Sequence, residues 1–221
     1  MEANARESGR YAVTKALHAT VAERRLSLYE GEALRLALPL DAGGRHRLVA
    51  GDDDIARRVV TALEDCPGVG VLPADGGLLG NLTVAGNFAL VLRYDAAEIR
   101  VLRDQDLDAA FQLCGMTPQR VEVLAREQPM NLERGERWKL GFVRWLLRPP
   151  ELLVIDRLFA GLTRRQANAL IAVEAVYHAR HPFRPVLFID LDSHELPLLP
   201  DCRSSTELTE LAEPTEAACH S

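Results

Sequence analysis

One stretch, residues 131–163, constrains the fold of this chain more than any other. Apolar residues recur over 135–148 at the spacing of one helical face. Two prolines then end the predicted helix, because proline cannot continue the ladder of backbone hydrogen bonds. Residues 152–155 are all apolar, as in a parallel strand that is covered on both faces. Asp156 follows at the carboxyl end of this strand, which is where open α/β sheets place their ligands.

The rest of the chain continues this alternation of strands and helices. Period-two alternation and short apolar runs predict further strands at 20–28, 33–40, 47–51, 69–72 and 186–189. Helical periodicity predicts further helices at 83–94, 106–114, 118–127 and 164–181. Strands that alternate with helices favour an α/β fold with a mostly parallel sheet.

Three motifs in the central stretch resemble those of the ATP-binding cassette (ABC) ATPases. The family's signature, LSGGE, corresponds to Leu132, Glu133, Arg134, Gly135 and Glu136. Its Walker B motif, hhhhDE, corresponds to LLVIDR at 152–157, and its SGLD to AGLT at 160–163. The motifs stand in order and at the family's usual spacing. The resemblance covers most of 20–205 and implies a P-loop NTPase-like domain, with an antiparallel N-terminal part and a helical subdomain at about 80–148.

The segment after the strand at 47–51 has the context of a phosphate-binding loop, G-x-x-x-x-G-K-[ST]. Its glycines, lysine and Ser/Thr fall, in order, on Gly51, Ala56, Arg57 and Arg58. Three aspartates at 52–54 occupy the place where bare N–H groups would attract phosphate, and they are expected to repel it. Asp54 is the predicted N-cap of the following helix. A capped helix that binds no ligand is therefore favoured over a working phosphate loop.

Other positions at which the family carries functional side chains are altered as well. The glutamate that would activate water falls on Arg157, which stays protonated and cannot act as a general base. The switch histidine falls on Leu191, and the nearby His194 is interpreted as a surface residue. In the signature, Glu133 and Arg134 replace the serine and the first glycine that would contact a γ-phosphate. Catalytic residues are therefore expected to be absent.

Two residues keep a type that the family uses to bind Mg-ATP. Asp156 is the candidate Mg²⁺ ligand, although a buried structural acid is the favoured interpretation. Tyr29 resembles the aromatic residue that stacks on adenine, and a tyrosine at the end of a hairpin is the alternative. With Gly51, Arg57 and Arg58, these residues form the candidate degenerate nucleotide site.

Residues 77–94 resemble the Q-loop region of cassettes that serve lipid and solvent-tolerance transporters. The glutamine of that loop falls on Ala74, and in most relatives the loop lies roughly twice as far from the phosphate loop, which indicates a trimmed fold. In the family, the helical subdomain grips a membrane permease. Candidates for such a groove are Leu78, Leu79, Phe88, Leu90 and Val91. An ordinary helical core is the alternative, because an apolar helical face does not reveal its partner.

Composition and charge limit the classes of partner that we expect for this chain. The 221 residues carry a net charge of −6, which does not favour nucleic acid, since phosphate contacts need a basic surface. No apolar run is long enough to cross a bilayer. The four cysteines are scattered, without a CxxC motif, and no signal peptide precedes them, so free thiols in a reducing cytosol are expected rather than a metal site.

These observations lead to one hypothesis with two alternatives. We expect a lead-in at 1–19, a degenerate ABC ATPase-like domain at 20–205 and a mobile acidic tail at 206–221. The domain is interpreted as a non-hydrolysing subunit of an importer or lipid-type transporter, without a cofactor. Its expected partners are a permease, a second ABC subunit or both, and it is placed in the cytoplasm, peripheral to the membrane. The alternatives are a weak ATPase that uses Mg-ATP and a stand-alone scaffold.

Overall fold

The computed structural model describes residues 16–73, 75–93, 104–157, 162–191 and 202–209. In these residues the strands are β1 (Leu17–Ala22), β2 (Arg25–Glu30), β3 (Ala33–Pro39), β4 (Arg45–Ala50), β5 (Val69–Leu72), β6 (Leu152–Asp156), β7 (Val186–Asp190) and β8 (Cys202–Leu208). The helices are α1 (Asp53–Glu64), α2 (Val84–Arg93), α3 (Asp104–Leu113), α4 (Pro118–Ala125), the 3₁₀ turn η1 (Pro129–Asn131), α5 (Arg134–Leu147) and α6 (Arg164–Arg180).

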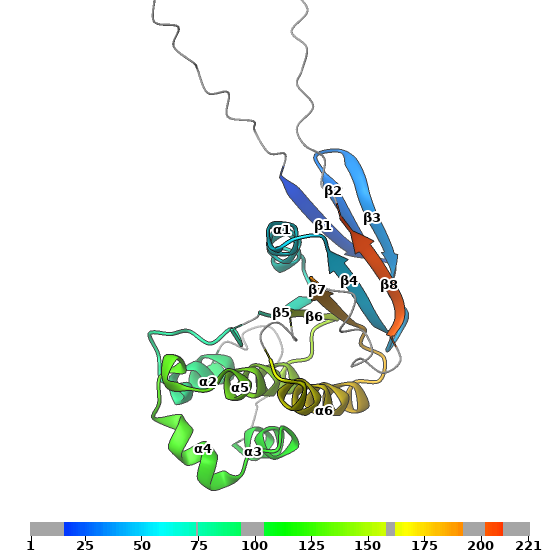
Figure 1. Ribbon diagram of the computed structural model, residues 1–221. Helices are drawn as coiled ribbons and strands as arrows, with labels where there is room; N and C mark the ends of the chain where they lie inside the picture. Colours follow the sequence, from blue (N-terminus) through cyan, green and yellow to red (C-terminus); the bar gives the residue numbers. More distant parts are fainter. Residues whose placement is uncertain (1–15, 74, 94–103, 158–161, 192–201, 210–221) are drawn as a thin grey trace, which may run out of the picture.

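Two sheets organise these elements. Strands β1, β2 and β3 form an antiparallel sheet in that order. The second sheet has the order β5-β6-β7-β4-β8, and all of its pairs are parallel. Figure 1 shows α1 and the antiparallel sheet on one side of the parallel sheet, and the remaining helices on the other. The carboxyl ends of β4, β6, β7 and β8 therefore meet at one edge.

The apolar strands of the parallel sheet supply two cores, because successive side chains of a strand point to opposite faces. In β6, Leu152 and Val154 pack into the core shared with α1 and the antiparallel sheet. Their neighbours Leu153 and Ile155 pack into the core under the helices. This explains why β6 is apolar from Leu152 to Ile155 instead of alternating with polar residues.

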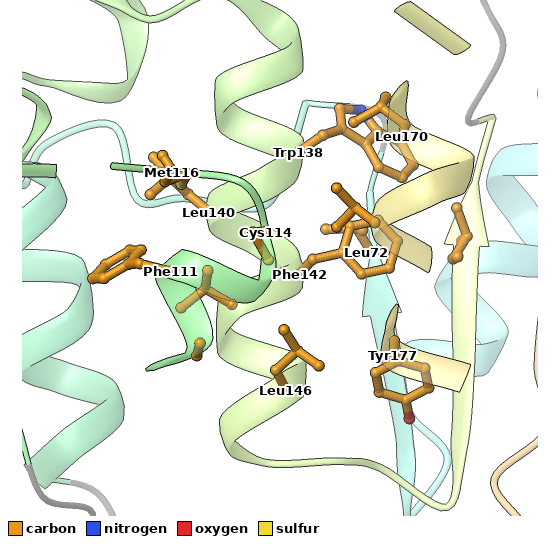
Figure 2. Close-up of a cluster of buried hydrophobic side chains, with 14 of the residues drawn as sticks. Leu72, Phe111, Cys114, Met116, Trp138, Leu140, Phe142, Leu146, Leu170 and Tyr177 are labelled. Carbon is orange, nitrogen blue, oxygen red and sulfur yellow. The ribbon is translucent and has the colours of Figure 1, made fainter. Parts of the chain in front are cut away.

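Helix α5 is the centre of the helical layer. Trp138, Phe142 and Leu146 stand one turn apart on its inner face and are all buried. Figure 2 shows them against Leu72 of β5 and Leu170 of α6, in the same cluster. The helical periodicity that the sequence shows over 135–148 is therefore the spacing of the residues that hold α5 on the sheet.

The segment predicted as one strand at 20–28 is two strands. Glu23 and Arg24 have φ angles of 49° and 59° and turn the chain between β1 and β2. Positive φ at both positions of a two-residue hairpin is the type I′ turn, and Gly, Asn or Asp are its usual residues. Because this turn is made by Glu and Arg, the sequence carries no local signal for it.

The two ends of the domain also differ from the prediction. Strand β1 begins at Leu17, inside the expected lead-in. Strand β8 reaches Leu208, inside the expected acidic tail, and pairs with β4 along its length. Its sequence is mostly polar because it is an edge strand with one neighbour, so it lacks the apolar run of a central strand.

Two further features bear on possible partners. Within the described ranges, no helix has the length and apolar character that a membrane crossing requires. Cys66, Cys114 and Cys202 are free thiols, whereas Cys219 lies outside the described residues.

Candidate functional site

The turn between β4 and α1 corresponds to the segment with the sequence context of a phosphate-binding loop. Only Gly51 and Asp52 separate the strand from the helix. The Gly51 N–H donates to the carbonyl of Leu208 on β8 at 2.9 Å, which ties the turn to the edge strand. Helix α1 begins at Asp53, so the residues aligned with the second half of the loop are already helical. A wide loop around a phosphate is therefore replaced by a tight turn.

Two N–H groups in the first turn of α1, those of Ile55 and Ala56, are bonded within the chain. Asp52, not Asp54 as predicted, is the N-cap, and its carboxylate accepts from the Ile55 N–H at 2.8 Å. The Ala56 N–H donates to the Asp52 carbonyl at 3.1 Å. The prediction was wrong by two positions because the helix starts earlier than the motif alignment suggests. A carboxylate thus occupies the position at which a helix N-terminus would bind an anion.

The three residues aligned with the end of the phosphate motif point to different places. Ala56 lies on the inner face of α1 and is fully buried in the core that this helix shares with the sheets. The Arg57 side chain is 62 % exposed and lies 3.6 Å from Asp53 and 3.5 Å from Asp54. Arg58 turns away from this edge toward the antiparallel sheet. The structure therefore does not bring these two guanidinium groups together around one anion.

Arg58 is held by a carboxylate that sequence reasoning missed. Glu30, at the end of β2, is only 2 % exposed, and its Oε1 accepts from Arg58 at 3.0 Å. Its other oxygen pairs with Arg35 of β3 at 3.0 Å. Nothing in the local sequence marks Glu30 as buried, because Gly31 follows directly and indicates only a turn. The pair joins α1 to the antiparallel sheet.

Asp156 and Arg157 form the centre of the site. Asp156 is buried at the end of β6, and its two oxygens accept from Arg157 Nε and Nη2, each at 2.7 Å. The Nη1 group of the same arginine contacts the Asp53 carboxylate at the start of α1. The hydrogen bonds to Asp156, and to a smaller extent the bond to Asp53, raise the pKa of Arg157, so this side chain stays positively charged. The carboxylate of Asp156 is thus paired with its own neighbour, as fits the favoured interpretation of a buried structural acid.

The backbone of Arg157 makes further connections. Its N–H donates to the Ile189 carbonyl of β7 at 2.8 Å. Its carbonyl accepts from Arg134 Nη2, at the start of α5, at 3.3 Å. The residue has a φ of 49°, in the left-handed region that non-glycine residues rarely adopt. This edge therefore contains a conformation that costs energy locally and is held by contacts with neighbouring elements.

The signature residues surround the start of α5. Leu132 is buried in the core, and Glu133 is the N-cap. The Glu133 N–H donates to the Glu136 carboxylate, which also pairs with Arg120 of α4. Burial, followed by repulsion from neighbouring arginines, lowers the pKa of Arg134. Gly135 has a space around it that would accept a β-carbon. The segment is a capped helix start in which Glu136 pairs with Arg120 and Arg134 donates to the Arg157 carbonyl.

Several candidates take structural positions. Tyr29 lies within β2, not in a turn, and its ring stacks on His18 of β1 at a centroid distance of 5.0 Å. Leu191 follows β7 and is partly exposed. Thr163 caps α6 by accepting from the Gln166 N–H at 3.3 Å. Candidates at positions 74, 160, 161 and 194 lie outside the described residues.

A second buried pair lies on the neighbouring strands and was also missed. Asp190 ends β7 as Asp156 ends β6, and both are buried. Its carboxylate lies 3.7 Å from the guanidinium of Arg47, which is fully buried within β4. An acid at the end of an apolar strand was the signal that pointed to Asp156, and the same signal marks Asp190. Each buried acid of this edge is thus accompanied by an arginine.

These contacts do not fit a bound Mg-ATP. The N–H groups of Gly51, Ile55 and Ala56 donate within the chain. The candidate metal ligand Asp156 faces a guanidinium at hydrogen-bond distance. In the part of the chain that the structure describes, no three Asp, Glu, His or Cys side chains are grouped as a metal site would require. Among the described residues, this arrangement joins elements by charge pairs, with Arg157 at the position of the general base and the oxygens of Asp156 bonded to its guanidinium.

The sequence of this chain is similar to those of known ATP-binding proteins. No family model matches it. It is 26 % identical over 170 residues to the molybdenum import ATP-binding protein ModC of Pseudomonas fluorescens, covering 76 % of this chain and 45 % of that protein. It is 31 % identical over 134 residues to ModC of Pseudomonas aeruginosa, covering 60 % of this chain and 34 % of the relative. The chain thus spans less than half the length of these curated relatives.

Solved structures agree on the fold. A dimeric bacterial ABC transporter cassette superposes with a TM-score of 0.55 at 12 % identity, covering 90 % of this chain and 94 % of that one. The cbiO1 component of an ABC transporter complex from Clostridium perfringens gives 0.55 at 13 % identity, covering 81 % and 79 %. The α/β P-loop NTPase-like fold is confirmed. The chain is thus similar in sequence to ATP-binding proteins of ABC importers, and its fold is that of the ABC cassettes.

Proposed function

We propose that this chain is a non-hydrolysing ABC subunit of a membrane transporter, with a structural or regulatory role. The observation that carries the proposal is the closure of the nucleotide edge by internal charge pairs. Arg157 binds both oxygens of Asp156 and also contacts Asp53. A triphosphate with its metal would have to break these bonds and enter beside three aspartates at 52–54.

The same residues remove the chemistry of hydrolysis. A general base must accept a proton from the attacking water, and a permanently charged guanidinium cannot do so. A metal ion needs open carboxylate oxygens, and those of Asp156 accept hydrogen bonds from Arg157. Substitution at one position would weaken turnover, whereas the combination leaves neither metal ligand nor base.

The names of the relatives favour import as the transport direction. Both aligned relatives are import ATP-binding proteins, and their alignments extend over 134 and 170 residues. The resemblance of 77–94 to lipid cassettes rests on a single segment. We therefore propose a subunit of an importer, and transport of lipids or other hydrophobic compounds is the second possibility.

We propose docking on a permease through the helical layer. Of the groove candidates, Phe88 does not fit, because it is buried in the core against Phe111. Leu79 is 52 % exposed just before α2 and is the candidate that a partner could cover. Its backbone is held in place, since its N–H donates to the Asn87 side chain at 2.7 Å and its carbonyl accepts from it. A partner would meet a preformed surface.

Calorimetry with Mg-ATP tests the loss of chemistry. The wild-type chain is expected to show no binding in the micromolar range and no release of phosphate. Arg157→Glu, which restores the acid of the family motif, is expected to remain inactive, because the turn after β4 still lacks a phosphate cradle. Micromolar affinity in the wild type would instead establish the weak-ATPase alternative.

Co-purification from detergent-solubilised membranes tests the partner. The wild type should retain a polytopic membrane protein identified by mass spectrometry. Leu79→Glu should lose it, whereas Leu34→Glu should not, since Leu34 is 54 % exposed on the distant strand β3. Recovery of no membrane protein by any of the three chains would favour the stand-alone scaffold.

A further inference from the structure

Arg157 joins separate parts of the nucleotide edge. Its side chain connects Asp156 of β6 with Asp53 of α1. Its N–H bonds to β7, and its carbonyl accepts from Arg134 of α5. The ends of two strands and the starts of two helices are thus linked through one residue.

The charge balance explains why an arginine is needed there. Asp156 is buried, and a buried carboxylate without a partner is strongly unfavourable. Two parallel bonds at 2.7 Å from the planar guanidinium are the strongest pairing that a protein side chain provides for a carboxylate. The third donor group reaches Asp53, which adds a second negative charge at the N-terminus of α1.

The backbone gives independent support. At a φ of 49°, glycine would be the least strained residue, and any other pays a conformational cost. The chain nevertheless carries a long charged side chain at this position. A strained non-glycine residue at the ligand edge of a sheet indicates that its side chain has a role which outweighs the strain.

We propose that Arg157 is a resident counter-ion, which fixes the ends of β6 and α1 in one arrangement without metal or nucleotide. This inference rests on the proposed function, since it assigns to a side chain the bridging that a ligand would otherwise provide at this edge. The domain is then held permanently in a single state, as suits a structural subunit.

Thermal unfolding of Arg157→Ala and Arg157→Gly tests the proposal. Both variants should lower the Tm by roughly 6–15 °C, because each leaves a buried carboxylate without its partner. Arg157→Gly should be the less damaging of the two by about 2–4 °C, since it relieves the positive φ. Arg126→Ala is the control: that side chain is 83 % exposed, lies 3.9 Å from Glu122, and should change the Tm by less than about 2 °C.

The Arg157→Gly variant distinguishes a stabilising bridge from a turn whose only effect is backbone strain. If Arg157 only occupies an unfavourable turn, Arg157→Gly raises the Tm, and the proposal is overturned. The double variant Asp156→Asn with Arg157→Ala removes both charges, so it should recover more than half of the loss caused by Arg157→Ala. A double variant as unstable as the single one also overturns the proposal, and this comparison holds even where Arg157→Ala does not fold.

Hydrogen exchange of the Arg157→Lys variant shows which elements the Arg157 bridge stabilises. Lysine keeps the charge but cannot make two parallel bonds. Exchange should therefore rise at the first turn of α1 and the end of β6, while α3 and α4 remain as in the wild type. Unchanged exchange at α1 and β6 would contradict the bridge. Failure of the proposed function would show separately, as micromolar Mg-ATP binding by the wild type.

Discussion

Replacing Arg58 with serine returns the hydroxyl that the family uses to hold Mg²⁺, and we expect it to destabilise the domain without restoring binding. In this structure Arg58 is 3.0 Å from Glu30, and that carboxylate is almost completely buried. A serine side chain is too short to reach it. The substitution therefore exchanges a contact that holds α1 on the antiparallel sheet for a hydroxyl at an edge that has no phosphate cradle.

The size of the loss follows from the geometry. Unit charges about 3 Å apart at an effective dielectric constant of about 20 attract by roughly 5 kcal/mol before solvation is counted. The hydration that Arg58 gives up when the wild type folds offsets much of this attraction, and Arg35 remains at 3.0 Å from the other oxygen of Glu30 in the variant. A hydrogen bond to a charged group contributes about 1.5–3 kcal/mol net, so we expect a loss of about 2 kcal/mol. For a domain of this size that corresponds to a Tm lower by about 4–8 °C.

Urea unfolding followed by circular dichroism measures this loss directly. Arg57→Ser is the matched control: the Arg57 side chain is 62 % exposed, so its replacement should change the free energy of unfolding by no more than about 0.5 kcal/mol. A double-mutant cycle with Glu30→Gln should give a coupling energy of about 1–2 kcal/mol. The reasoning fails if Arg58→Ser is as stable as the wild type, or if it binds Mg-ATP in the micromolar range.

Three further outcomes are expected. Burial raises the pKa of Glu174, against the opposing effect of Arg45, so the native state binds this proton more readily than the unfolded state. The contribution of Glu174 to stability should then fall as pH rises from its ordinary value of 4.5 through the raised value, and Glu174→Gln should abolish that part of the pH dependence in urea unfolding. Burial raises the pKa of Cys114 to about 12, so at pH 8 this thiol should react with iodoacetamide, as read by mass spectrometry, only after unfolding. Gly43→Ala should cost at least about 1 kcal/mol more than Gly115→Ala in the same unfolding assay; both glycines have positive φ, but only the first would press a β-carbon into backbone.

Much of the fold could be predicted from local patterns. The strand at 69–72 has the predicted bounds, α5 lies one residue earlier than predicted at both ends, and α6 ends one residue earlier than predicted. Apolar runs and helical periodicity are local properties of an element, so they survive whatever the element packs against. The errors arose where the signal is not local, as in the Glu-Arg turn between β1 and β2 and in the polar edge strand β8.

The candidate site was predicted only in part. The alignment indicated which residue types replace those of the family, and Asp156 was expected to be a buried acid, as it is. The partners of these residues were not predictable. Arg157 contacts Asp53, which is 104 positions away in the chain, and Arg58 contacts Glu30, which is 28 positions away.

The sequence by itself determined the order and type of most elements and the family resemblance, because spacing along the chain encodes periodicity and motifs. Only the tertiary structure decided which charge meets which. Side-chain direction depends on strand register, on where α1 begins and on how that helix is rotated against the sheet. Small differences in those quantities separate a cradle for phosphate from the closed set of charge pairs around Arg157.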